Sequence, residues 1–101
     1  MSTNTATLAQ LENAMDLVHS VFPGTNSYSW PLINQRAGTE VWVKHENHSP
    51  IGAFKIRGGL VYMREMGVSH PKMITATRGN HGQSIAVSSA RFGVEATIVV
   101  P

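Results

Sequence analysis

Lys55 is the residue of this sequence whose type and surroundings most clearly allow covalent chemistry. It lies in the stretch IGAFKIRGG, residues 51–59, directly after Phe54 and between glycines. The pattern around it predicts a loop that leads into a helix, so Lys55 stands near a helix N-terminus. The positive end of the helix dipole, together with burial, would favour the neutral amine. A neutral lysine amine is the form that attacks a carbonyl to give a Schiff base.

A second stretch, TATRGNHGQSIA at residues 75–86, predicts another glycine-containing loop that runs into a helix. The unpaired N–H groups and the dipole of a helix N-terminus attract anions, and glycines let an anion approach the backbone closely. The residues that would form such a carboxylate or phosphate cradle are Thr77, Gly79, Asn80, His81 and Gly82. The residues alone therefore suggest a lysine nucleophile beside an anion-binding loop. An ordinary helix lysine beside an ordinary strand–helix turn is the alternative.

The elements that would position these loops follow from the apolar spacing. Strands are predicted at 40–46, 72–77 and 95–100, with helices at 54–66 and at about 80–92 between them. An earlier helix begins at Thr7, where Gln10 completes a capping box, and ends at FPG, residues 22–24. Strand, helix, strand, helix, strand with short links predicts an α/β fold with a parallel sheet. Both loops would then share the rim formed by the carboxyl ends of the strands.

Composition limits the possible classes of protein. The chain has 101 residues, 42% hydrophobic and 14% charged, which indicates one small globular region. The net charge is +2 with scattered basic residues, so we expect no nucleic-acid partner. There is no cysteine, no apolar run approaches the roughly 20 residues of a membrane span, and residues 1–16 show no secretory signal. We therefore expect no membrane partner and a cytoplasmic location.

The two stretches VKHENHSPIGAFKIRG and TRGNHGQSIA together resemble the fold-type II pyridoxal-phosphate enzymes, specifically the serine/threonine dehydratase branch. This branch includes threonine ammonia-lyase and serine racemase. The family pattern is Lys-x-Glu-Asn, then Pro-Thr-Gly-Ser-Phe-Lys-x-Arg-Gly, then Ser-x-Gly-Asn-His-Gly/Ala-Gln. WPL at residues 30–32 is similar to the family's Thr-Pro-Leu. The resemblance covers residues 30–101 and implies a tryptophan synthase β-like α/β fold, with residues 1–29 as an N-terminal helix and loop.

The resemblance also implies a role for each matching residue. Lys55 would form the Schiff base with the aldehyde of pyridoxal 5'-phosphate, and Phe54 would lie near the cofactor ring. Asn80 would donate a hydrogen bond to the phenolic oxygen of the cofactor. Thr77, Gly79 and His81 would line the loop that binds the α-carboxylate of the amino acid. The implied reaction is β-elimination, in which a hydroxy amino acid such as L-threonine or L-serine gives a 2-oxo acid and ammonia.

Arg78 departs from the family pattern. In the racemase branch a serine at this position is the second acid/base, whereas arginine stays protonated and makes a poor base. Two-base racemisation is therefore disfavoured, although a serine racemase-like enzyme stays among the alternatives. Arg78 could instead pair with a second carboxylate, as in a 3-hydroxyaspartate dehydratase. The plainer alternative is an arginine that faces solvent.

The C-terminal end of the sequence suggests that the chain is part of a larger protein. The chain ends at Pro101 directly after a buried-looking strand, so we expect residues 30–101 to be a partial catalytic region. An inactive fragment without the phosphate-binding loop is the alternative from another class, and a homo-oligomer is expected at full length.

Asn80 could also cap the second helix. His45 and His48 are expected to face opposite ways, so no metal site is expected there.

Overall fold

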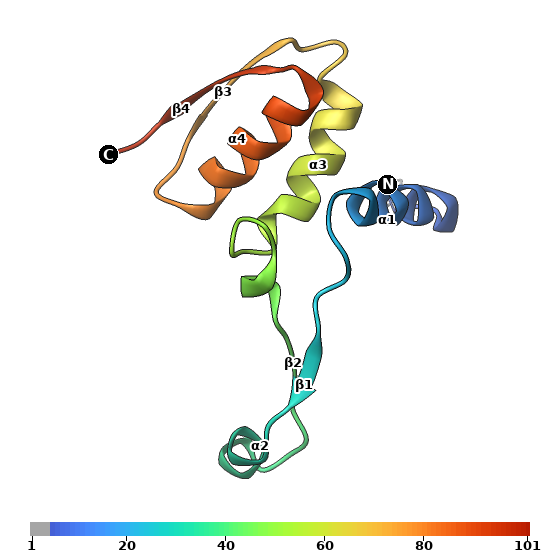
Figure 1. The fold of residues 1–101 in the computed structure, drawn as a ribbon, viewed down its shortest axis with the longest axis vertical. Helices are drawn as coiled ribbons and strands as arrows, with labels where there is room; N and C mark the ends of the chain where they lie inside the picture. Colours follow the sequence, from blue (N-terminus) through green and yellow to red (C-terminus); the bar gives the residue numbers. More distant parts are fainter. Residues whose placement is uncertain (1–4) are drawn as a thin grey trace.

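The computed structural model describes residues 5–101 as a pair of packed helices beside a small sheet, with a projecting arm (Figure 1). The part of the predicted N-terminal segment that comprises residues 1–4 lies outside the described residues. The elements are α1 (Leu8–Val21), β1 (Ser27–Ser29), α2 (Pro31–Ala37), β2 (Trp42–Lys44), the 3-10 turn η1 (Glu46–His48), α3 (Lys55–Met66), β3 (Lys72–Ala76), α4 (Asn80–Phe92) and β4 (Glu95–Val99).

Helix α1 begins with the capping box that the sequence predicts. The Gln10 amide donates to Thr7 Oγ1 at 3.2 Å, and the Thr7 amide donates to Gln10 Oε1 at 2.8 Å. The helix ends at Val21, and the backbone amide of the C-cap residue Phe22 donates to the Val18 carbonyl. The capping residues thus satisfy two of the backbone groups that a helix N-terminus leaves without partners.

The β3–α4–β4 unit confirms the second half of the predicted α/β pattern. Strands β3 and β4 are parallel, with Lys72 opposite Glu95 and Ala76 opposite Val99. Gly93 ends α4 in the left-handed conformation at φ 67°, which glycine adopts without steric cost. The side chains of Met73, Ala96 and Ile98 face the helices, whereas Ile74 on the other face of the sheet is 74% exposed. Within residues 5–101, helices therefore cover one face of this sheet.

The strand predicted at 40–46 does not belong to the parallel sheet. It forms the short strand β2, which pairs antiparallel with β1, with Ser27 opposite Lys44 and Ser29 opposite Trp42. The α/β class is confirmed, but the parallel sheet of the described residues has two strands rather than three. The short α2 connection allows β1 and β2 to pair locally, whereas a parallel partner requires a longer crossover. An alternating side-chain pattern predicts a strand but does not identify the strand with which it pairs.

Two apolar clusters hold α1, α3, α4 and the parallel sheet together. One cluster joins α1 to α3 through Val18, Phe22, Ile56 and Leu60. The other joins α3 and α4 to the sheet through Met63, Ile85 and Val94. Phe92 packs against both clusters. Helix α3 thus lies at the centre of the fold, and Lys55 is its first residue.

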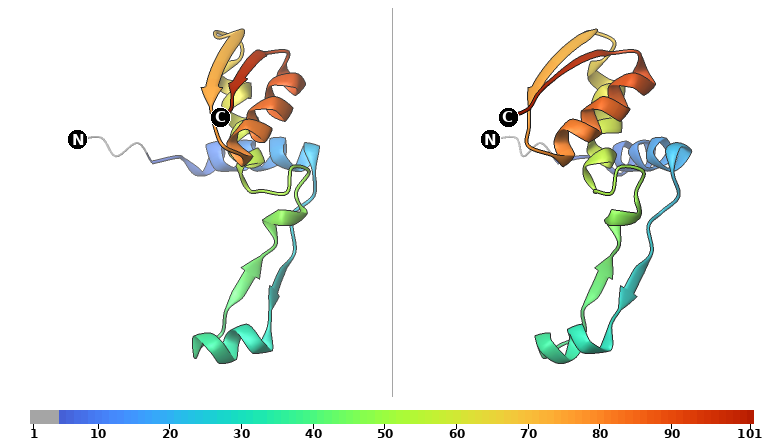
Figure 2. Two further views of the ribbon diagram at one scale, coloured as in Figure 1. Left: turned by 90° about the vertical axis from the view of Figure 1, so that its left-hand side faces the viewer. Right: turned by 60° about the vertical axis from the view of Figure 1, so that its left-hand side comes forward.

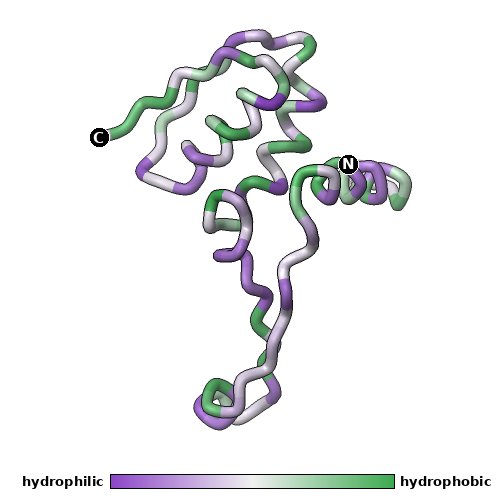
Figure 3. Tube along the Cα trace, viewed as in Figure 1, coloured by the Kyte–Doolittle hydropathy of each residue, from purple (hydrophilic) through white to green (hydrophobic). Residues whose placement is uncertain are grey.

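The arm formed by β1, α2 and β2 projects from this core (Figures 1 and 2). The radius of gyration is 16.5 Å, compared with about 13 Å for a compact domain of this length. Leu32 and Trp42 on the arm are 79% and 64% exposed. Figure 3 shows apolar residues within the arm and along the C-terminal strand as well as in the packed helices. None of the helices described in residues 5–101 has both the length and the apolar character needed to cross a membrane.

Candidate functional site

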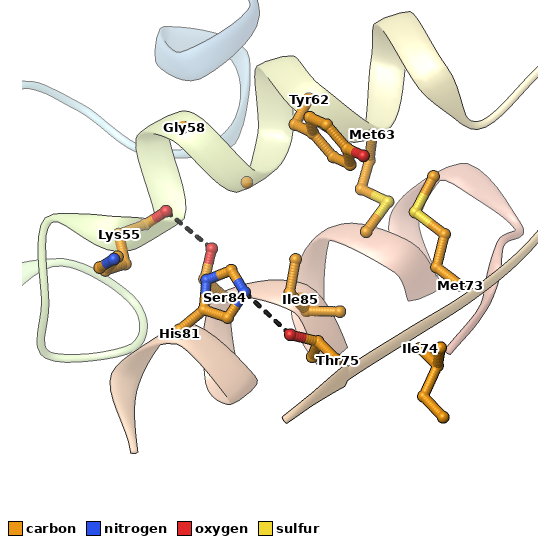
Figure 4. A pocket seen from close by; sticks show the side chains of 11 residues that line it. Lys55, Gly58, Tyr62, Met63, Met73, Ile74, Thr75, His81, Ser84 and Ile85 are labelled. Carbon is orange, nitrogen blue, oxygen red and sulfur yellow. Dashed lines mark hydrogen bonds between the residues drawn. The ribbon is translucent and has the colours of Figure 1, made fainter. Parts of the chain in front are cut away.

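A pocket of about 590 Å³ lies between α3, α4 and β3 (Figure 4). Both polar and apolar residues line it. The lining residues are Lys55, Gly58, Gly59, Tyr62, Met63, Met73, Ile74, Thr75, His81, Ser84 and Ile85. The pocket therefore lies between Lys55 and His81, one residue from each of the two segments that the sequence singled out.

The loop before α3 is closed by hydrogen bonds that fix where Lys55 begins the helix. Ser49 is 7% exposed, and its hydroxyl donates to the Ala53 carbonyl at 2.7 Å while accepting from the Ala53 amide at 3.0 Å. Gly52 adopts φ 70° and its amide donates to the Ser49 carbonyl. A residue with a Cβ would be strained at this positive φ. The local sequence SPIGA thus builds a tight turn immediately upstream of the lysine.

Lys55 itself is exposed within the described residues, so the expected burial of this side chain is wrong for them. Its Nζ lies 6.0 Å from the centroid of the Phe54 ring, and Phe54 is 62% exposed. The backbone of Lys55 is more firmly held, because its carbonyl accepts a hydrogen bond from Ser84 Oγ at 2.7 Å.

The other side of the pocket is built by β3 and the first two turns of α4, and the turn that connects them lies beside the pocket. Gly79 precedes the helix, and its amide donates to Thr77 Oγ1 at 3.1 Å. Asn80 is the first residue of α4 and makes no side-chain capping hydrogen bond, so the suggested cap role of Asn80 is wrong. His81 lines the pocket, where Nε2 lies 3.1 Å from Thr75 Oγ1. This contact fixes the imidazole of His81 against the end of β3.

A charged pair that the sequence analysis missed joins the two ends of the Lys55 loop. Arg57 donates from Nε to Glu46 Oε2 at 2.7 Å and from Nη2 to Glu46 Oε1 at 2.9 Å. Thr25 donates to the same carboxylate, and the guanidinium lies 5.0 Å from the Phe22 ring centroid. The Arg57 hydrogen bonds hold the pKa of Glu46 at about 2, and the pKa of Arg57 is raised by the same hydrogen bond. The signal available in the sequence was the opposite charges on either side of the loop.

The histidines at 45 and 48 do not face opposite ways as expected. Their rings stack with centroids 5.3 Å apart, because η1 turns the chain directly after His45. Trp30 Nε1 contacts His45 Nε2 at 3.4 Å. Among residues 5–101, no group of three or more His, Cys, Asp or Glu side chains could hold a metal ion.

The structure brings some of the predicted site residues together and leaves others beside the pocket. Lys55 and His81 line it, whereas Phe54, Thr77, Arg78, Gly79 and Asn80 do not. Arg78 is exposed and makes no ion pair within the described part of the chain. Packing of α3 on α4 creates the juxtaposition, rather than a sheet rim shared by three strands. Ser84 and Thr75 also line the pocket, and neither was predicted individually from the sequence.

The family model and the similar proteins agree on the kind of protein that this chain resembles. The family model described as pyridoxal-phosphate dependent enzyme matches residues 21–101. Threonine dehydratase 1 biosynthetic, chloroplastic, of Solanum lycopersicum is 37% identical over 73 residues, which are 70% of this chain and 12% of the relative. L-threonine ammonia-lyase of Thermotoga maritima is 31% identical over 97 residues, which are 94% of this chain and 24% of the relative.

A solved structure shows the same arrangement of the backbone. The crystal structure of a pyridoxal 5'-phosphate-dependent aspartate racemase superposes with a TM-score of 0.79 at 30% identity. The match covers 100% of this chain and 33% of the racemase chain. The chain thus spans a third or less of the length of these relatives, between 12% and 33%.

Proposed function

Because the chain belongs to the family of pyridoxal-phosphate-dependent enzymes, we propose that it contributes Lys55 and the turn before α4 to the active site of an ammonia-lyase. The proposed reaction is the β-elimination of a hydroxy amino acid such as L-threonine or L-serine. The family and the cofactor are those that the two sequence motifs predicted, and both are confirmed. The reaction and the substrate rest on the threonine dehydratase and ammonia-lyase relatives.

One observation carries the proposal. Lys55 at the start of α3 and His81 in the first turn of α4 line one pocket, although they lie on different helices (Figure 4). The pocket fits the proposed cofactor chemically. It offers an amine for an aldehyde, apolar side chains such as Met63 and Ile85 for a ring, and a nearby helix N-terminus for an anion.

Pyridoxal phosphate, when bound, supplies an electron sink that stabilises negative charge at the α-carbon of the amino acid. The residues of this chain supply the rest. Lys55 Nζ is proposed to hold the cofactor covalently and to accept the α-proton, a role that needs a base within hydrogen-bond distance. The N–H groups at the start of α4, with Thr77 and Gly79 beside them, are proposed to bind the α-carboxylate. Phe54 and Asn80 are proposed to contact the cofactor.

A second candidate function is action on an acidic amino acid such as 3-hydroxyaspartate. Arg78 is exposed directly before Gly79 and makes no ion pair within residues 5–101, so its guanidinium is available to a second carboxylate. The similar solved structure is that of an aspartate racemase, whose name indicates an acidic substrate. Arginine at this position argues against racemisation here, because it cannot serve as a base.

Covalent trapping tests the central role of Lys55. The chain is mixed with pyridoxal phosphate, reduced with borohydride and digested, and the adduct is mapped by mass spectrometry. We expect the adduct at Lys55, with Lys44 and Lys72 as internal controls for nonspecific labelling, and its loss in Lys55→Ala. Equal labelling of the three lysines would count against the proposal.

The substrate is tested by turnover of the full-length protein on threonine, serine and 3-hydroxyaspartate. Arg78→Ser should reduce kcat/KM for 3-hydroxyaspartate while leaving threonine and serine within about twofold, since only the dicarboxylate would lose a charge-assisted hydrogen bond. An equal loss on all three substrates would remove the second candidate. A homo-oligomer and a cytoplasmic location stay predictions, and the tomato relative is named as chloroplastic.

A further inference from the structure

We propose that Ser84 is a positioning residue for Lys55 and that Gly59 provides the space through which the serine reaches it. The inference rests on the function proposed above for Lys55 and adds a residue that acts through its backbone. Ser84 lies on α4 and Lys55 on α3, so the two residues connect the helices that form the pocket (Figure 4).

The contact is a partly buried hydrogen bond between two helices. Ser84 Oγ donates to the Lys55 carbonyl oxygen at 2.7 Å, and Ser84 is 1% exposed. In an α-helix this carbonyl also accepts the amide of the residue four positions later, and a carbonyl oxygen can accept both bonds. The serine therefore adds an external anchor to the first turn of α3. Because the Ser84 side chain is buried, leaving its hydroxyl without this partner would be costly.

Gly59 makes the approach possible. A Cβ at position 59 would overlap Ser84 Oγ and would lie 2.8 Å from Ser88 Oγ. Any side chain at this position would push α4 away from α3 or rotate the serine away from the lysine carbonyl. The glycine is thus explained by close helix packing at the base of the pocket rather than by an unusual backbone angle.

The bond couples the two halves of the proposed site. Lys55 is the first residue of α3, and Ser84 lies little more than one turn into α4, the helix that begins at Asn80. With the bond intact, the backbone from which the lysine amine extends and the N-terminal turn of α4 keep a fixed relative position. Active-site side chains need such support from neighbouring groups to hold their geometry.

Ser88 offers a matched control one turn further along α4. It is 0% exposed, it also borders Gly59, and its hydroxyl has no hydrogen-bond partner among the described residues. Ser88→Ala and Ser84→Ala remove the same atom from the same buried helix interface. Only Ser84→Ala removes a bond to the residue that carries the amine.

The experiment compares the wild-type chain, Ser84→Ala and Ser88→Ala by two readouts. The first is the rate of borohydride-trapped adduct formation with pyridoxal phosphate at Lys55, relative to Lys44 and Lys72 in the same sample. The second is amide hydrogen exchange over residues 56–60 without cofactor. We expect Ser84→Ala to slow relative trapping at Lys55 and to speed exchange, each by about threefold to tenfold, the range that one ordinary hydrogen bond supports. Ser88→Ala should match the wild type in both readouts.

The possible outcomes separate this inference from the proposed function. Absence of a Lys55 adduct in the wild type would overturn the proposed function and this inference together. Specific trapping at Lys55 that is equal in wild type and Ser84→Ala would overturn the positioning role alone, and so would equal effects of Ser84→Ala and Ser88→Ala. If Ser84→Ala does not fold, Ser84→Cys replaces the hydroxyl by a somewhat larger thiol that is only a weak donor. The cysteine variant must then show slower trapping than Ser88→Ala, and equal rates would again overturn the inference.

Discussion

Arg57 holds Glu46 through two parallel hydrogen bonds, from Nε to Oε2 at 2.7 Å and from Nη2 to Oε1 at 2.9 Å. The pair closes the loop that leads to Lys55, because Glu46 precedes that loop and Arg57 follows the lysine on α3. Paired two-point contacts of this kind are stronger and more directional than single ion pairs. The side chains of Arg57 and Glu46 are 28% and 19% exposed, so water only partly screens them.

Loss of this pair should destabilise the protein at neutral pH. Glu46→Gln removes the charge but keeps the shape of the side chain. We expect the free energy of unfolding at pH 7 to fall by about 1.5–3 kcal/mol, the range for hydrogen bonds to charged groups. Urea denaturation measures it. Glu95→Gln, which breaks the exposed Lys72–Glu95 pair at 3.2 Å, is the control and should cost less than about 1 kcal/mol.

The same pair predicts a dependence of stability on pH. The pKa of Glu46 is lowered from 4.5 to about 2, chiefly by its hydrogen bond from Arg57. The carboxylate therefore stabilises the fold fully above pH 4.5, and this contribution is lost as the pH falls from 4.5 towards 2. The difference in unfolding free energy between wild type and Glu46→Gln should shrink over that window. A difference that stays constant from pH 6 to pH 3 would contradict the assignment.

Gly59 and Gly58 are neighbours on α3 that should respond in opposite ways to alanine. A Cβ on Gly59 would overlap Ser84 Oγ, whereas a Cβ on Gly58 would meet no atom within 4 Å. Gly59→Ala should cost about 1–3 kcal/mol through overpacking. Gly58→Ala should stabilise by about 0.5–1 kcal/mol, because alanine restricts the unfolded chain more than glycine does. Thermal or urea unfolding measures both, and equal effects would show that α3 and α4 are not this close.

Alanine at position 82 should destabilise the protein by a steric clash, and a substitution at Thr77 can test that clash. A Cβ there would lie 2.5 Å from Thr77 Cγ2 and 3.1 Å from Ile98 Cγ2. Gly82→Ala should therefore lower stability by about 1–3 kcal/mol. Thr77→Ser removes the clashing methyl but keeps the hydroxyl that accepts from the Gly79 amide. In a double-mutant cycle, Thr77→Ser should recover part of the loss, and strict additivity would refute the contact.

Ser49 should contribute substantially to the stability of the protein although its side chain is small. Its buried hydroxyl makes two hydrogen bonds to Ala53, one as donor and one as acceptor. Ser49→Ala should cost about 1–3 kcal/mol, because it leaves the Ala53 backbone groups unsatisfied. Ser20→Ala is the control, since the exposed Ser20 hydroxyl makes one bond to the Leu17 carbonyl. Hydrogen exchange at residues 49–54 should rise in Ser49→Ala only.

The sequence by itself determined the local elements and the family of the protein. The capping box at Thr7, the helices that begin near Lys55 and Asn80, and the left-handed stop at Gly93 depend on residues close together in the chain. Local propensities and caps are encoded within a few residues, so a pattern can show them. The spacing of the two glycine-containing motifs likewise identified the family.

Only the tertiary structure decided which elements meet. The partner of strand 42–44, the pairing of Glu46 with Arg57, and the approach of Ser84 to Lys55 all join residues that lie apart in the sequence. Each depends on packing distances that the sequence does not encode locally, such as the space left by the missing Cβ of Gly59. The sequence therefore supplied Lys55 and His81, and the packing of α3 on α4 placed both residues at one pocket.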